Sequence, residues 1–231
     1  MLLDLFSFDL NDPLLEATME VFAIEDYYEL IEKQIEHVQK TQKLKLDAYI
    51  VSEKLTPDDP EWQEAIQEYY HLVDFLLPRF FRGPFLVSLY ALYESVVTEI
   101  ANLAQASHPN SKRFSNYKRG GKLNFLDRSR EYYAEILCIE LCSDESAQSR
   151  LLALLEFRHA LAHANGRLEL VHQAKKPVVL ELIRTLPDVD THSGYITFGK
   201  DFVADTTRIV INELRRLIED NRESCRSVKT V

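Results

Sequence analysis

The feature that most constrains the fold is a long run of apolar residues spaced three and four positions apart near the start of the chain. This run covers residues 13–53, and its spacing places one continuous apolar stripe along a helix. The segment Thr56–Pro60 should end this helix, because two prolines and two turn-forming acids follow each other there. The stripe consists of Leu14, Ala17, Val21, Ile24, Tyr28, Ile31, Ile35, Val38 and Leu46.

Glycine and proline are scarce, which favours long helices over many tight turns. The chain has 231 residues but only 6 Gly and 8 Pro. Apolar spacing predicts further helices at 61–77, from 84 to about 106, at 123–141, from 144 or 146 to 164, and at 200–222. Pro78 and the Gly83-Pro84 pair are expected to separate the first two of these. Asn165-Gly166 is expected to end the helix that precedes it, because both residue types tolerate the left-handed conformation.

The pattern changes between residues 167 and 198. Segments 167–172 and 178–184 alternate in steps of two residues, which predicts a small β-hairpin, and 194–198 could add a third strand. The predicted fold is therefore mainly α, an antiparallel helical bundle with a small hairpin before the last helix. Residues 1–60 would supply an N-terminal long helix and 61–231 the helical domain, together in one compact domain.

The charge is strongly negative overall and unevenly distributed. The net charge is −10, which excludes a protein that coats nucleic acid broadly, so any contact with RNA has to be local. Residues 112–122 form a basic loop that also contains Phe114 and Tyr117, and cations with aromatic rings are what single-stranded RNA binds. A solvated loop without a ligand is the alternative. The predicted RNA-binding residues are Lys112, Arg113, Tyr117, Lys118, Arg119 and Lys122.

The cysteine count and the hydropathy pattern favour a cytoplasmic protein. Cys138 and Cys142 lie four residues apart on a predicted helix, where a disulfide is geometrically awkward, so reduced thiols are expected. The N-terminal residues are interrupted by Asp4 and Asp9, unlike a signal peptide. We expect neither a membrane span nor a bound cofactor.

The segment 151–166, LLALLEFRHALAHANG, places ionisable groups in an otherwise apolar helix. A buried arginine needs a partner or an opening to solvent, which makes Arg158 notable. His159 and His163 share one helical face and are spaced like metal ligands, but no third ligand is evident. A purely structural alternative pairs Arg158 with a core glutamate and places the histidines near the negative end of the helix dipole.

The six residues Arg158 to His163 resemble the Arg-x4-His motif of HEPN domains, a family of helical proteins that includes RNA-cutting enzymes. His159 stands at the polar second position, where asparagine is the most frequent residue of the family. The resemblance covers roughly residues 81–165. It implies metal-independent endoribonuclease activity, a homodimer with a composite cleft, and a toxin or phage-defence role with an antitoxin or other regulatory partner.

The implied reaction assigns a role to each residue of the motif. The 2′-hydroxyl of the RNA attacks the adjacent phosphate, with His163 as the acid–base and Arg158 as the phosphate stabiliser. Glu94 would orient Arg158 or His163, and His159 would support these two catalytic residues. A HEPN-like module that binds RNA, a nucleotide or a partner protein without catalysis is the alternative.

Overall fold

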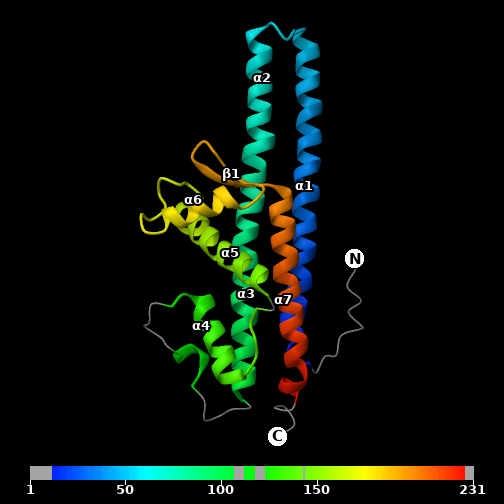
Figure 1. Ribbon diagram of the computed structural model, residues 1–231. Coiled ribbons are helices and arrows are strands. Elements are labelled where there is room, and N and C mark those ends of the chain that lie inside the picture. Colours follow the sequence, from blue (N-terminus) through cyan, green and yellow to red (C-terminus); the bar gives the residue numbers. More distant parts are fainter. Residues whose placement is uncertain (1–11, 107–111, 118–122, 143, 227–231) are drawn as a thin grey trace. The chain divides into compact units, whose positions relative to one another are not determined.

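The structure, a computed structural model, describes residues 12–106, 112–117, 123–142 and 144–226, with side chains described up to Arg222. It is mainly helical, with one small antiparallel hairpin before the last helix, as predicted (Figure 1). None of the described helices is long and apolar enough to cross a membrane. The elements are α1 (Leu15–Glu53), α2 (Pro60–Tyr70), η2 (His71–Leu76), α3 (Leu77–Ala106), η3 (Phe114–Asn116), α4 (Phe125–Tyr132), η4 (Tyr133–Leu137), α5 (Glu145–Ala164), α6 (Lys176–Thr185), β1 (Val189–His192), β2 (Tyr195–Phe198) and α7 (Lys200–Arg226).

The described residues divide into two compact units, and several long helices contribute to both. The first unit combines the residues up to Asp26 with Ser88–Leu155 and the chain from Asp205 onward. The second unit combines Tyr27–Val87 with Glu156–Ala204.

Tyrosine rings fill the core of the first unit. Tyr90 and Tyr93 of α3 are fully buried, as are Tyr132 and Tyr133 at the junction of α4 and η4. The Tyr133 hydroxyl donates a hydrogen bond of 2.6 Å to the backbone oxygen of Val97, which ties this junction to α3. The helical segment ends at Leu137, not at residue 141 as predicted, because Cys138 adopts the left-handed conformation with φ of 57°.

Two cysteines of this unit differ in exposure. Burial, with a smaller contribution from Glu213, raises the pKa of Cys142 to about 11, whereas Cys138 is exposed. Since the thiolate is the reactive form, iodoacetamide at pH 8 should alkylate Cys138 in the folded protein and Cys142 only after unfolding. Peptide mass spectrometry checks this, and equal labelling of both in the folded state would contradict the buried position of Cys142.

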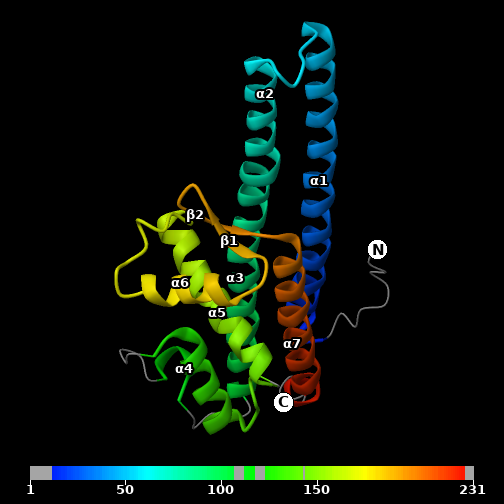
Figure 2. The same ribbon diagram turned by 45° about the horizontal axis from the view of Figure 1, so that its top comes forward.

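In the second unit, the part of α1 after Asp26 runs antiparallel beside α2 and η2 (Figures 1 and 2). The Gln39 amide donates a hydrogen bond of 3.1 Å to the backbone oxygen of Val73, joining α1 to η2. An ion pair joins α1 to α3 in the same unit. Arg82 of α3 binds both carboxylate oxygens of Glu32 on α1, each at 2.8 Å. Both side chains are almost completely buried, at 11% and 8% exposure.

The predicted breaks at Pro78 and Gly83-Pro84 are wrong, because α3 passes through both positions. Pro78 is the second residue of α3, which continues directly from η2, since the Leu77 amide donates to the Leu72 carbonyl. Pro78 has no N–H to donate. The Val73 carbonyl, five residues before it, accepts the hydrogen bond from Gln39 instead. Pro84 is tolerated inside the helix. Gly83 lies where α3 approaches α5, and a Cβ built at this position would come within 3.2 Å of Leu161 Cδ2. Gly83 therefore permits close packing of the two helices.

The structure contains the predicted hairpin, but its strands are not the segments 167–172 and 178–184 that the alternating pattern indicated. Residues 178–184 belong to helix α6, which begins with a proline in its first turn and buries Val179. The strands are β1 and β2, paired from Val189 with Phe198 to His192 with Tyr195. Ser193 and Gly194 form the two-residue turn with φ of 51° and 79°, the conformation that tight hairpins require. The third strand proposed at 194–198 thus corresponds to β2.

Candidate functional site

Helix α5 begins and ends where its flanking residues favour it. The Asp144 carboxylate accepts a hydrogen bond of 2.7 Å from the Ala147 amide and caps the first turn. At the other end Asn165 and Gly166 have φ of 50° and 73°, and the Gly166 amide donates to the Ala160 carbonyl at 3.0 Å. This closing pattern satisfies backbone groups that would otherwise lack partners.

The last turn of α5 is also tied to neighbouring elements of the second unit. The Arg79 guanidinium of α3 donates to the Asn165 carbonyl at 3.2 Å. The Ile196 amide of β2 donates to the Gly166 carbonyl at 2.9 Å. These two bonds hold the helix end that contains His163 in a fixed position.

Three of the predicted site residues lie together on this part of α5. Arg158 and His159 are partly exposed and His163 is exposed, whereas Phe157 before them and Ala160 between them are buried. The imidazole rings of His159 and His163 are nearly parallel, with 6.2 Å between centroids and 29° between planes. The predicted helical placement of the motif is therefore confirmed.

Both imidazoles line a small cavity, named here the histidine pocket. Its volume is about 270 Å³, and His172 and Lys175 from the segment before α6 also face it. Arg158 is not among its lining residues. The histidine pocket is lined by Glu156, His159, Ala160, His163, Ala164, Leu170, Val171, His172, Lys175 and Val179.

An ion pair and a fixed imidazole shape the electrostatics of the histidine pocket. The Lys175 ammonium lies 2.5 Å from one carboxylate oxygen of Glu156, whose side chain is 13% exposed. The Ala174 amide donates a hydrogen bond of 3.2 Å to Nδ1 of His172. A neutral His172 then carries its proton on Nε2, because Nδ1 acts as the acceptor.

The pKa of His159 is lowered from 6.5, chiefly because burial disfavours the charged imidazolium. Glu156 opposes this shift, while the positive charges of Arg158, Lys175 and a protonated His163 add to it. His159 is therefore mainly neutral at pH 7 and can accept a proton or a hydrogen bond.

Glu94 belongs to the first unit, whereas Arg158 and His163 belong to the second. It is partly exposed on α3, and its backbone oxygen accepts a hydrogen bond of 2.7 Å from the Thr98 hydroxyl. The orienting role of Glu94 stays a prediction.

The basic loop is described only in part. Lys112 and Arg113 are exposed in the first unit, while Lys118, Arg119 and Lys122 lie outside the described residues. Tyr117 is 4% exposed, packs edge-on against Tyr132 and donates a hydrogen bond to Glu135. Phe114 is also buried against Tyr132. Their burial speaks against base stacking by these two rings, so RNA contact would rest on the cations.

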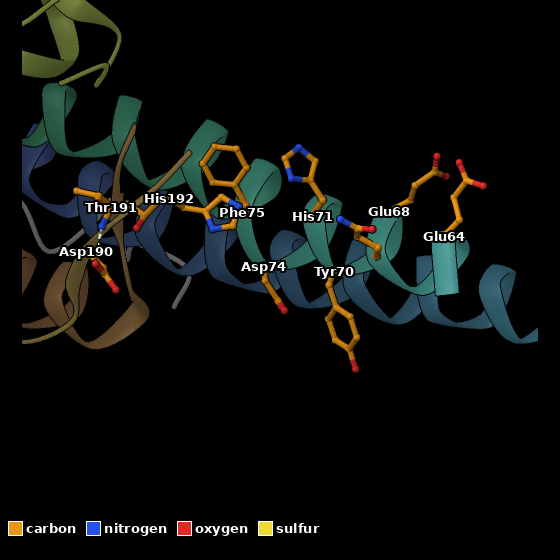
Figure 3. Close-up of a pocket in the computed structure, with 11 residues that line it drawn as sticks. Glu64, Glu68, Tyr70, His71, Asp74, Phe75, Asp190, Thr191 and His192 are labelled. Atoms are coloured by element: carbon orange, nitrogen blue, oxygen red, sulfur yellow. Dashed lines mark hydrogen bonds between the residues drawn. The ribbon is translucent and has the colours of Figure 1, made fainter. Parts of the chain in front are cut away.

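A second, larger cavity of the unit lies between the α2–η2 segment and the hairpin, and we name it the acidic groove (Figure 3). Its volume is about 710 Å³, and its charged lining residues are carboxylates. The ring of His192 lies beside that of buried Phe75 (Figure 3). The two ring centroids are 4.4 Å apart. Such a groove repels RNA and attracts positively charged groups. Its acidic and imidazole side chains are Glu64, Glu68, His71, Asp74, Asp190 and His192.

Sequence reasoning missed both the acidic groove and the contribution of residues 172–175. The groove joins residues more than a hundred positions apart, so no local spacing signals it. His172 and Lys175 were assigned to a strand and its turn, which gave no reason to place them beside α5. Among the described residues, no group of three or more His, Cys, Asp or Glu side chains is arranged to hold a metal ion.

Comparisons with known protein families, with curated proteins and with solved structures find no match to this chain.

Proposed function

We propose that this protein is a metal-independent endoribonuclease of the HEPN type, with Arg158 and His163 as its catalytic residues. One observation supports the proposal most. The end of α5 presents His163 at the surface, beside a cavity lined by two further imidazoles and a lysine. Proton-exchanging groups and a cation are the groups that RNA transesterification needs.

The proposed reaction needs only the RNA and the side chains of the protein. The 2′-oxygen attacks the neighbouring phosphorus, and its proton passes to an imidazole acting as base. The bond from phosphorus to the 5′-oxygen breaks, and that oxygen takes a proton from an acid. The guanidinium of Arg158 stabilises the charge that develops on the phosphate oxygens. The products are a 2′,3′-cyclic phosphate and a 5′-hydroxyl.

The position of Arg158 around the helix favours a site built from two chains. A helix turns by about 100° per residue, so Arg158 and His163 point about 140° apart. Since Arg158 does not line the histidine pocket, we propose that the active protein is a two-fold dimer. Arg158 of one copy would then act beside His163 of the other.

Mixed dimers test this composite site. We expect Arg158→Ala and His163→Ala homodimers each to be inactive. A heterodimer of the two, isolated by a different affinity tag on each chain, should regain about half of the wild-type rate, because one of its two sites is intact. An inactive heterodimer that forms normally would show instead that both residues act within one chain.

The experiment that tests the activity itself uses end-labelled RNA in EDTA. The wild-type protein should cut the RNA and leave DNA of the same sequence intact, because DNA lacks the attacking 2′-hydroxyl. A single 2′-deoxy nucleotide on the 5′ side of a cut phosphate should abolish that cut alone. Cleavage that persists at the substituted position would contradict the proposed chemistry.

A non-catalytic binding module is the second candidate, and the acidic groove is the observation that favours it. The groove is larger than the histidine pocket and lies in the volume range of small-molecule sites, about 300–1,000 Å³. Binding of a positively charged ligand or of a basic partner protein, without RNA cleavage in any ionic condition, would favour this candidate.

The resemblance to HEPN proteins also suggests the biological setting. We propose a toxin or phage-defence effector in the cytoplasm, restrained by an antitoxin or another regulatory protein. Growth arrest on expression of the wild type in bacteria, but not of His163→Ala at equal protein level, would support this setting.

A further inference from the structure

We propose that the histidine pocket binds one unstacked nucleobase next to the phosphate that is cut, and that Glu156 selects bases with an amino group. This inference rests on the proposed ribonuclease function, since it supplies the substrate contact that the catalytic residues alone do not provide.

The size and walls of the pocket suit a nucleobase. Its volume of about 270 Å³ is below the usual range for drug-sized ligands, about 300–1,000 Å³, and leaves room for one ring system. Ala160, Ala164, Val171 and Val179 form buried apolar walls. The faces of a base are apolar enough to replace water against such walls.

The imidazoles give the pocket a stacking surface. His159 and His163 lie nearly parallel at the pocket, and histidine is among the side chains on which unpaired RNA bases stack. Burial keeps His159 mainly neutral, as its lowered pKa indicates, so its ring can stack without a charge to solvate. A base held here would bring its own ribose and phosphate next to His163.

Glu156 supplies the polar selection. One of its carboxylate oxygens binds Lys175, while the other is buried and has no hydrogen-bond partner among the described residues. An unsatisfied buried acceptor is costly. This oxygen is shielded from solvent, so the Glu156 side chain has to rotate toward the pocket before the N–H of a base can bind it and relieve that cost. Adenine, cytosine and guanine carry an amino group, whereas uracil flanks its N–H with two carbonyl oxygens that a carboxylate repels. The pocket should therefore prefer amino-bearing bases.

Two exposed leucines provide a matched pair of test variants. Leu170 is 59% exposed and lines the pocket, whereas Leu180 is 44% exposed on α6 and does not line it. Leu170→Asp and Leu180→Asp change the net charge equally and disturb no buried side chain. The Leu170→Asp variant alone places a carboxylate and its bound water at the mouth of the pocket.

The measurement is the affinity of the full-length protein for fluorescent oligonucleotides of 2′-O-methyl adenosine, cytidine or uridine, read by anisotropy. These RNAs cannot be cut, because the 2′-oxygen is blocked. We expect Leu170→Asp to bind the adenosine oligonucleotide about tenfold more weakly than the wild type, the scale of one lost apolar contact. Leu180→Asp should bind like the wild type, and uridine should bind more weakly than adenosine or cytidine.

The outcomes separate this inference from the proposed function. Equal affinities of the two variants, or no binding by the wild type, would overturn the base pocket, and equal affinity for all three oligonucleotides would overturn the selection by Glu156. Pocket-dependent binding without cleavage of unmodified RNA would support the pocket and reject the nuclease. If the wild type cuts unmodified RNA but Leu170→Asp and Leu180→Asp bind the oligonucleotides equally well, the nuclease is supported and the base pocket is rejected.

Discussion

His163→Ala should lower the rate of RNA cleavage by about 100- to 1,000-fold, the usual contribution of a positioned acid–base group. The side chain is exposed at the end of α5, so its removal leaves no cavity in the core. Folding should therefore be unaffected, and the loss should appear in kcat more than in KM. Initial rates on end-labelled RNA in EDTA measure the effect, and circular dichroism checks the fold.

An exposed histidine elsewhere in the second unit gives the matched control. His37 lies on α1 and does not line the histidine pocket. His37→Ala should cleave RNA at the wild-type rate. Equal rates for the wild type and His163→Ala would remove His163 from the chemistry, whatever other activity the protein has.

Arg82→Met should lower the free energy of unfolding by about 3–5 kcal/mol, the range observed when one partner of a buried ion pair is removed. Arg82 binds both carboxylate oxygens of Glu32 and also donates to the Phe198 carbonyl at 3.2 Å. The Glu32 side chain is only 8% exposed. Replacing Arg82 leaves this buried carboxylate without its counter-ion. Urea unfolding followed by circular dichroism gives the measurement.

Two further variants show whether the buried charge is the cause. The double variant Arg82→Met with Glu32→Leu should recover much of the stability, because apolar replacement of a whole buried pair is often neutral. Glu29→Gln breaks the exposed pair with Lys33 and should leave the unfolding midpoint unchanged. If the single and double variants at Arg82 were equally unstable, lost packing and not the orphaned charge would explain the effect.

The long helices could be predicted from sequence because each has a strong local signal. The stripe of α1 keeps its spacing over many turns, and Leu14, Val21 and Ile35 are buried as predicted. Both ends of α5 were also predicted, because the residues that form them act locally. Asp144 caps the first turn through the Ala147 amide, and Asn165-Gly166 end the helix through their left-handed backbone. Signals of this kind need no knowledge of the rest of the fold.

The errors arose where tertiary packing decides between two local conformations. Residues 178–184 alternate in apolar character, yet they belong to the helix α6, which has a proline in its first turn and buries Val179. Gly83-Pro84 predicts a break before the helix that follows it, but α3 continues through Pro84, and the packing of α3 outweighs the lost hydrogen bond. Short apolar segments and single prolines are ambiguous for this reason.

The candidate site was only partly predictable. Arg158, His159 and His163 share one helix, so their spacing placed them correctly. His172 and Lys175 reach the same pocket through a turn whose path no sequence pattern specifies. The sequence predicts that Tyr117 contacts RNA, but its ring packs against Tyr132 in the core of the first unit. The sequence signals aromatic character there, not whether the ring faces solvent.

The chemical ends of the RNA fragments test the central claim most directly. The wild-type protein is incubated with RNA in EDTA, and the ends are identified by mass spectrometry and by their response to phosphatase and kinase. The proposed mechanism predicts 2′,3′-cyclic phosphates and 5′-hydroxyls, because the 2′-oxygen is the nucleophile. Fragments with 5′-phosphates and 3′-hydroxyls would contradict it, since a water molecule would then have attacked the phosphorus.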